Sequence, residues 1–169
     1  NAMVAGGLEV ADSLYNTLKV LQGEGYRVEG LPATLDAFKA LIQKQGPVLA
    51  PYAAGDMAGF FTDGDPALVT AQAFDRWCSK DLNPKMCAQI EAMYGRSPGS
   101  YMTTVKEGVE YLGVARIQLG NVVLVPQPLP GIGENTFALV HGTRNAPPYP
   151  YVASYLWTRN VFEPHAIMH

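Results

Sequence analysis

The sequence predicts a single α/β domain with a mostly parallel, Rossmann-like sheet, helices on both faces and one β-hairpin. Helical and extended patterns alternate along the first fifty residues, which is typical of a parallel sheet covered by helices. The chain has 169 residues, 48% of them hydrophobic, and this is enough for one substantial core. We assign residues 3–169 to one domain, because Asn1 and Ala2 before the first methionine look like a cloning remnant.

The N-terminal elements follow from the spacing of apolar residues. Residues 11–21 carry a stripe at helical spacing that ends in two glycines, and a short strand is expected at 26–28. A second stripe at 35–42 predicts another helix, with Thr34 as its N-cap. A brief extended segment follows at 47–51.

The middle of the chain contains two signals for the start of a helix. Asp65-Pro66 and Asn83-Pro84 each join a capping residue to a proline that suits the first helical position. Cys78 and Cys87 follow these signals without the paired spacing of a zinc site, and two cysteines do not indicate a disulfide scaffold. We therefore expect both cysteines to be core residues.

A hairpin is predicted near residue 120. Ala115, Ile117 and Leu119 alternate with polar residues, Gly120 and Asn121 favour a turn, and a continuous apolar run follows. The second strand leads to a glutamine-containing loop at the end of the sheet. In open α/β folds, ligands usually bind at such an edge.

The last residues predict an aromatic helix and an unfinished strand. The aromatic side chains between 151 and 162 are at helical spacing and are more often core than ligand-lining. Residues 166–169 are interpreted as a short buried strand that stops at His169, so we expect the chain to be a piece of a longer protein. His165 is interpreted as a surface or structural residue.

Composition excludes several classes of function. The net charge is −3 and the basic residues are scattered, so nucleic acid is not an expected partner. No apolar run approaches the roughly 20 residues needed to span a bilayer, so no membrane span is expected in this piece. The sequence lacks a G-x-x-x-x-G-K-[ST] loop and a G-x-S-x-G elbow, which argues against ATP hydrolysis and acyl transfer by this chain.

Four segments near the C-terminus resemble the CobN and magnesium-chelatase large (H) subunit family. They are residues 120–128, the glycine loop at 129–136, the aromatic helix at 147–159, and Ala166-Ile-Met-His169. Weaker similarities at 6–8 and 94–99 extend the resemblance over nearly the whole chain.

The resemblance implies part of the tetrapyrrole-binding large subunit of a cytoplasmic, ATP-dependent metal chelatase, a ligase that forms nitrogen–metal bonds. A divalent metal (cobalt, magnesium or iron) and a tetrapyrrole are its implied substrates. AAA+ chelatase subunits are the implied partners, and they use the ATP, which is not bound here. We expect this piece alone to be inactive.

The resemblance also implies candidate site residues. His169 matches the first histidine of the family motif and is the candidate for catalysis and metal binding, since metal insertion removes two pyrrole protons and an imidazole can accept one. Gln127 matches the glutamine of the Gln-Pro loop. Glu134, His141 and Arg144 are further substrate-binding candidates, and the last two are available to meet macrocycle carboxylates.

Several alternatives remain open at this point. The loops resemble those of the haem-uptake-associated HmuS type, which favours haem iron handling equally with cobalt insertion in cobalamin biosynthesis, with magnesium insertion third. A structural or partner-docking segment of the subunit would bind no ring. A Rossmann-like small-molecule binding domain unrelated to tetrapyrroles rests on fold analogy alone.

Overall fold

A computed structural model of the chain describes residues 10–44, 57–126 and 146–168. The helices are α1 (Val10–Gly23), α2 (Leu35–Lys44), α3 (Met57–Thr62), α4 (Ala71–Asp81), α5 (Pro84–Tyr94) and α7 (Tyr149–Trp157), which continues into the π-helix η2 (Thr158–Phe162). The strands are β1 (Ala67–Thr70), β2 (Thr103–Lys106), β3 (Val109–Val114), β4 (Ile117–Leu119) and β5 (Val122–Leu124).

The described strands are antiparallel, so the predicted mostly parallel sheet is wrong for them. One sheet has the order β1-β3-β2, and β4 pairs only with β5 among the described strands. Leu112 at the centre of β3 lies opposite Val69 of β1 and Thr103 of β2. A two-residue turn joins β2 to β3, with positive φ at both Glu107 and Gly108, the geometry that suits the twist of an antiparallel hairpin.

The segment after Asp65 forms a strand where a helix was predicted. Ala67 and Val69 are buried while Leu68 is 36% exposed, a two-residue period that four residues are too few to reveal in the sequence. Helix α4 begins only at Ala71, and its N-cap is Thr70, whose hydroxyl accepts a hydrogen bond from the backbone N–H of residue 73.

Three other local chemical signals were interpreted correctly. Thr34 caps α2 by accepting a 3.2 Å hydrogen bond from Ala37 N–H. Asn83 caps α5 in the same way through Lys85 N–H. The β4–β5 hairpin turns at Gly120, as predicted.

Two predicted strands do not form. Residues 26–28 have no strand pairing, although Val28 is buried. Residues 163–168 form neither helix nor strand, and Ile167 and Met168 are 63% and 75% exposed, so the predicted buried strand is wrong over these residues. The extended segment predicted at 47–51 lies outside the described residues.

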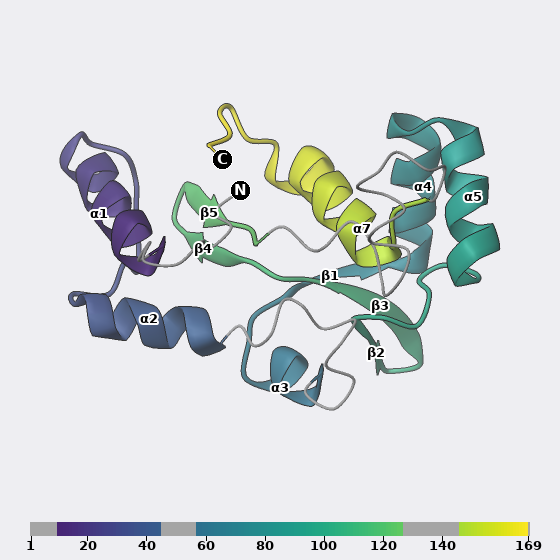
Figure 1. Ribbon diagram of the computed structural model, residues 1–169, viewed down its shortest axis with the longest axis horizontal. Helices are drawn as coiled ribbons and strands as arrows, with labels where there is room; N and C mark the ends of the chain where they lie inside the picture. The colour runs from purple at the N-terminus through teal and green to yellow at the C-terminus, as the bar shows by residue number, and fades with distance from the viewer. Residues whose placement is uncertain (1–9, 45–56, 127–145, 169) are drawn as a thin grey trace.

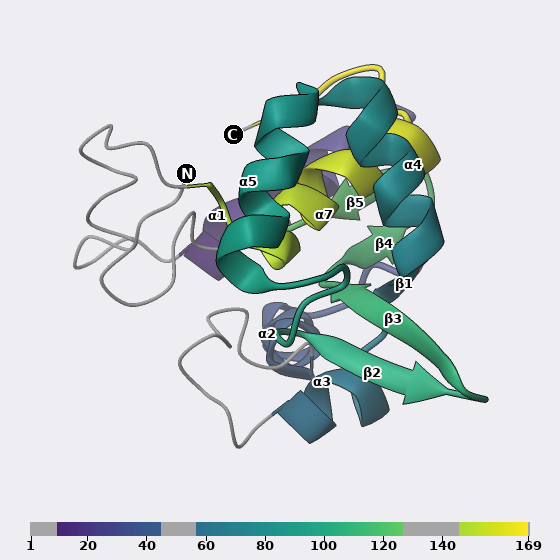
Figure 2. The same ribbon diagram turned by 90° about the vertical axis from the view of Figure 1, so that its right-hand side faces the viewer.

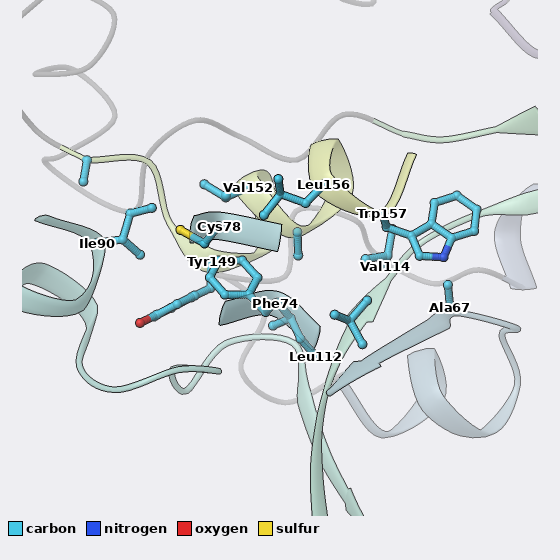
Figure 3. Close-up of a cluster of buried hydrophobic side chains, with 13 residues drawn as sticks. Ala67, Phe74, Cys78, Ile90, Leu112, Val114, Tyr149, Val152, Leu156 and Trp157 are labelled. Carbon is cyan, nitrogen blue, oxygen red and sulfur yellow. The ribbon is translucent and has the colours of Figure 1, made fainter. Parts of the chain in front are cut away.

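Helices lie on both faces of the three-stranded sheet, as predicted. Figure 2 shows α4, α5 and α7 on one side and α3 on the other. On the first side, Phe74, Leu112, Tyr149 and Leu156 belong to the main core drawn in Figure 3. On the second, Phe60 is completely buried against Met102 and Ala115.

A second core lies at the other end of the molecule. Helices α1 and α2 pack on the β4–β5 hairpin, to the left of the main body in Figure 1. Leu18, Val28 and Phe38 meet Ile117 and Leu119 there. The β3–β4 segment therefore runs from one core into the other.

Cys78 and Cys87 are joined by a disulfide that links α4 to α5. Both contribute to the main core, which confirms their predicted packing, with Cys78 only 3% exposed. Their pairing was not predicted, because nine residues of separation place the two cysteines on different helices whose packing the sequence does not reveal. None of the described helices is long and apolar enough to cross a bilayer.

Candidate functional site

The predicted site residues all lie outside the part of the chain that the structure describes. They are Gln127, Glu134, His141, Arg144 and His169. Their proposed roles stay predictions. The structure does describe the framework from which they extend: β5 before residue 127, helix α7 after residue 145, and the approach to residue 169.

The start of α7 is fixed to the end of α5 by hydrogen bonds from two tyrosines, one on each side of the contact. Tyr94 Oη donates to the carbonyl oxygen of Ala146 at 2.9 Å, and Tyr149 Oη donates to the carbonyl oxygen of Gly95 at 2.7 Å. Ala146 is 1% exposed. Ala146 and the first turn of α7 are therefore held against the end of α5.

The hydroxyl of Tyr149 is held in its neutral form by its surroundings. Burial, followed by the negative charges of Glu91 and Asp75, raises the pKa of Tyr149 to about 12. Its ring packs edge-on to Phe74, with ring centroids 5.1 Å apart. Tyr149 is thus a hydrogen-bond donor and a packing residue at neutral pH.

The other end of α7 is a π-turn. The backbone N–H of Glu163 donates to the carbonyl oxygen of Thr158 at 2.9 Å, and Glu163 adopts the left-handed conformation at φ 50°. Single π-turns inside helices are frequent at functional sites. Here the turn is the last regular structure before the segment that leads to His169.

A polar cluster holds this π-turn against the end of α4. Asp81 accepts hydrogen bonds from Asn160 Nδ2 at 2.7 Å and from Arg159 Nε at 3.1 Å. Lys80 Nζ donates to Asn160 Oδ1 at 3.1 Å. The hydrogen bond from Asn160 holds the pKa of the Asp81 carboxyl below its usual range, and the positive charges of Arg159 and Lys80 act in the same direction. The carboxyl is therefore ionised at neutral pH.

Sequence reasoning missed this cluster, although one signal was present. An acid at the C-terminal end of a helix opposes the helix dipole, so Asp81 in the last position of α4 calls for a compensating partner. The partner is 79 residues away in the sequence, and no local pattern identifies it.

An aromatic and cationic contact supports the π-turn from the sheet side. The Trp157 and Phe162 rings are stacked with centroids 6.3 Å apart. The guanidinium of Arg116 lies 5.7 Å from the Trp157 ring. The aromatic side chains between residues 151 and 162 were expected to be core. Trp157 is buried as expected, whereas Tyr155 is 50% exposed.

Two observations concern metal binding and the remaining histidine. Within the described ranges, no group of three or more His, Cys, Asp or Glu side chains is placed to hold a metal ion. His165 is exposed, which agrees with its interpretation as a surface residue. The described residues thus form the helix ends and the sheet that flank the predicted site residues.

Comparison with known proteins identifies the scaffold. The family model described as CobN/Magnesium Chelatase matches residues 1–169, the whole chain. The chain belongs to this family. The resemblance found in the sequence is therefore confirmed, and an unrelated small-molecule binding domain is no longer an alternative.

Individual relatives match the chain with similar coverage. An uncharacterized protein of Methanocaldococcus jannaschii is 30% identical over 98% of the chain and 13% of its own length. The magnesium-chelatase H subunit of Rhodobacter capsulatus is 26% identical over 99% of the chain and 12% of its own length. The chain thus spans about an eighth of these relatives.

A solved structure of the family has the same fold over this region. The catalytic subunit of cobaltochelatase from Mycobacterium tuberculosis superposes with a TM-score of 0.69 and 28% sequence identity, covering 95% of the chain and 13% of that protein. The antiparallel sheet with its flanking helices therefore corresponds to a region of a chelatase catalytic subunit.

Proposed function

We propose that this chain forms part of the tetrapyrrole-binding large subunit of an ATP-dependent metal chelatase. The observation that carries the proposal is the match of the family model to all 169 residues. The similarity to a magnesium-chelatase H subunit and to a cobaltochelatase catalytic subunit supports it. In this proposal AAA+ partner subunits hydrolyse the ATP, in the cytoplasm, and this chain contributes to the macrocycle site.

The proposed chemistry is the exchange of two pyrrole protons for one divalent metal ion. His169 accepts a pyrrole proton or guides the metal, because a neutral imidazole can do either at neutral pH. Gln127 and Glu134 contact the macrocycle, and His141 and Arg144 meet its carboxylates. The two tyrosine hydrogen bonds at the start of α7 support this arrangement by fixing Ala146 and Tyr149, which follow Arg144 in the sequence.

Cobalt insertion into a corrin precursor and the handling of haem iron are the two branches we propose, with magnesium insertion third. The direction of transfer separates them, because one branch inserts a metal and the other removes iron from a finished ring. Both need the same ring-binding surface and a proton acceptor or donor beside the pyrrole nitrogens.

An absorption titration of the full-length gene product tests the proposal. Haem, metal-free porphyrin and a corrin precursor are each added to the wild type and to His169→Ala, with His165→Ala as a matched exposed-histidine control. We expect one macrocycle to bind, and we expect His169→Ala alone to lower affinity or turnover. The macrocycle that binds identifies which of the proposed branches applies.

The same titration distinguishes a structural or partner-docking role. If no macrocycle shifts its absorption spectrum with the full-length protein, ring binding fails and docking to the AAA+ subunits becomes the better account. If a ring binds and His169→Ala behaves like His165→Ala, ring binding stands and the role of His169 fails.

A further inference from the structure

The carboxylate of Asp81 and the amide of Asn160 form the centre of the contact between α4 and the π-turn. The Asp81 side chain is 5% exposed, and Asn160 uses its amide nitrogen twice, donating to Asp81 at 2.7 Å and to the carbonyl oxygen of Leu156 at 3.0 Å. The amide oxygen accepts from Lys80. Asn160 thus joins the backbone of α7 to the end of α4 through one side chain.

This contact holds the turn at which the chain leaves the helix. In an α-helix each residue advances by about 100°, so the extra residue of a π-turn rotates everything after it by roughly that angle. Asn160 lies in the middle of the turn, and its bonds to Leu156 and Asp81 stabilise the turn in this register. Glu163 then ends it in the left-handed conformation.

Within the part of the chain that the structure describes, the segment after the turn is largely exposed. Residues 163–168 form neither helix nor strand, and Ile167 and Met168 are 63% and 75% exposed. A segment with few contacts takes its direction from the point at which it is anchored. That point is the π-turn, held on one side by Asp81 and on the other by the stack of Phe162 on Trp157.

We infer that Asp81 and Asn160 are positioning residues for the chelatase reaction, which set the direction of the segment that carries His169. The inference rests on the proposed role of His169 as the proton acceptor or metal guide. Misplacement of a reacting group by about 1 Å can cost about a hundredfold in rate, so a contact nine residues upstream can control turnover without touching the ring.

The test uses metal insertion by the full-length gene product with its partner subunits, ATP and divalent metal, at single turnover so that low residual rates stay measurable. Asn160→Asp places two carboxylates against each other. The double variant Asp81→Asn with Asn160→Asp restores an amide–carboxylate pair in the opposite sense. Asp75→Asn removes the same charge from an exposed position of α4 and is the matched control.

Asn160→Asp is expected to lower the rate by at least about tenfold, within the range that misplacement of a reacting group can cost, while the apparent affinity for the tetrapyrrole changes less than about twofold. The double exchange is expected to recover part of the rate, because it restores the bond between positions 81 and 160 but not the bond to the carbonyl oxygen of Leu156. If Asn160→Asp does not fold, Asp81→Asn, which keeps an acceptor oxygen, is expected to give a smaller loss in the same direction.

A double-mutant cycle with His169→Ala decides whether the contact acts through that histidine. We expect Asn160→Asp, or Asp81→Asn in its place, to cause no further loss when His169 is already alanine. An equal loss in both backgrounds, or no loss in the wild-type background, overturns the positioning role and leaves the proposed function intact. No effect of His169→Ala by itself overturns the proposed role of His169 and the positioning role that depends on it, while ring binding is judged by the titration alone.

Discussion

The hydroxyl of Tyr149 at the start of α7 lies 2.7 Å from the carbonyl oxygen of Gly95, the residue that caps α5. The same tyrosine fills the space above Gly99, where an added Cβ would lie 2.6 Å from its ring. Tyr149 therefore joins the end of α5, the loop after it and the first turn of α7. Its removal affects the framework of the proposed site before any catalytic group is touched.

We predict that Tyr149→Phe lowers the free energy of unfolding by about 1 kcal/mol at neutral pH, the typical net value of one hydrogen bond. Chemical denaturation measures the change. Tyr26→Phe is the control, because Tyr26 is 60% exposed. Equal stability of the two variants would show that the bond to Gly95 contributes nothing.

The raised pKa of Tyr149 gives a second, pH-dependent prediction. The folded protein holds this phenolic proton up to about pH 12, whereas an unfolded tyrosine loses it near pH 10. The stabilisation is therefore complete below pH 10 and is lost as the pH rises from 10 to 12, where the folded state binds more protons. Wild-type stability should fall more steeply than that of Tyr149→Phe across this window in denaturation curves.

Gly113 in β3 lies directly under the rings of α3. A Cβ at this position would be 2.5 Å from Phe60 and 2.8 Å from Phe61. We predict that Gly113→Ala costs about 1–3 kcal/mol of stability through overpacking. Gly59→Ala in α3 is the control, since its Cβ meets only Asp63 at 3.8 Å and alanine favours a helix; thermal unfolding should separate the two variants.

Gly120 in the β4–β5 turn combines a positive φ of 64° with a close backbone approach. Its Cβ would lie 2.5 Å from the carbonyl oxygen of Arg27, which accepts a 2.8 Å hydrogen bond from Asn121 N–H. Gly108 also has a positive φ, 77°, but with open space around it. Gly120→Ala should therefore destabilise clearly more than Gly108→Ala, and the difference in unfolding free energy measures the steric contact. Equal losses of stability in the two variants would show that backbone strain at positive φ, without the steric contact, accounts for the destabilisation.

The bond between Cys78 and Cys87 predicts a response to reductant. Closing a loop of this length in the unfolded chain is worth about 3 kcal/mol in the chain-entropy treatment, and the cysteines are nine residues apart. We expect no reactive thiol in the denatured, unreduced protein, and a loss of stability of about that size on reduction. Cys78→Ser with Cys87→Ser should abolish the response, and two titratable thiols before reduction would contradict the bond.

Local chemistry explains which parts of the fold the sequence predicted. The caps at Thr34 and Asn83 and the turn at Gly120 act within a few residues, so their patterns suffice. Strands β1 and β2 are four residues long and gain their identity from pairing with β3, which no short window reveals. The parallel sheet was predicted from alternation alone, and the antiparallel pairing of β3 with β1 and β2 overturned it.

The candidate site shows the same difference between features with a local signal in the sequence and features that depend on distant residues. The family motif led from the sequence to His169 and Gln127, and their roles stay predictions because both lie outside the described residues. The contact between Asp81 and Asn160 could not be predicted, because it joins residues 79 positions apart through side chains that each have ordinary local neighbours. Family membership itself was readable from short motifs and is confirmed over the whole chain.

The second core, in which α1 and α2 pack on the β4–β5 hairpin, has a consequence for biosynthesis. The two helices are synthesised before α3, and the strands that bury Leu18 and Phe38 are made only after the whole of α3, α4, α5 and the three-stranded sheet. Until then these apolar faces lack the part of their native cover that β4 and β5 supply. A pause in translation upstream of Ile117 thus leaves the nascent chain with apolar helix surface incompletely covered, the state on which chaperones act.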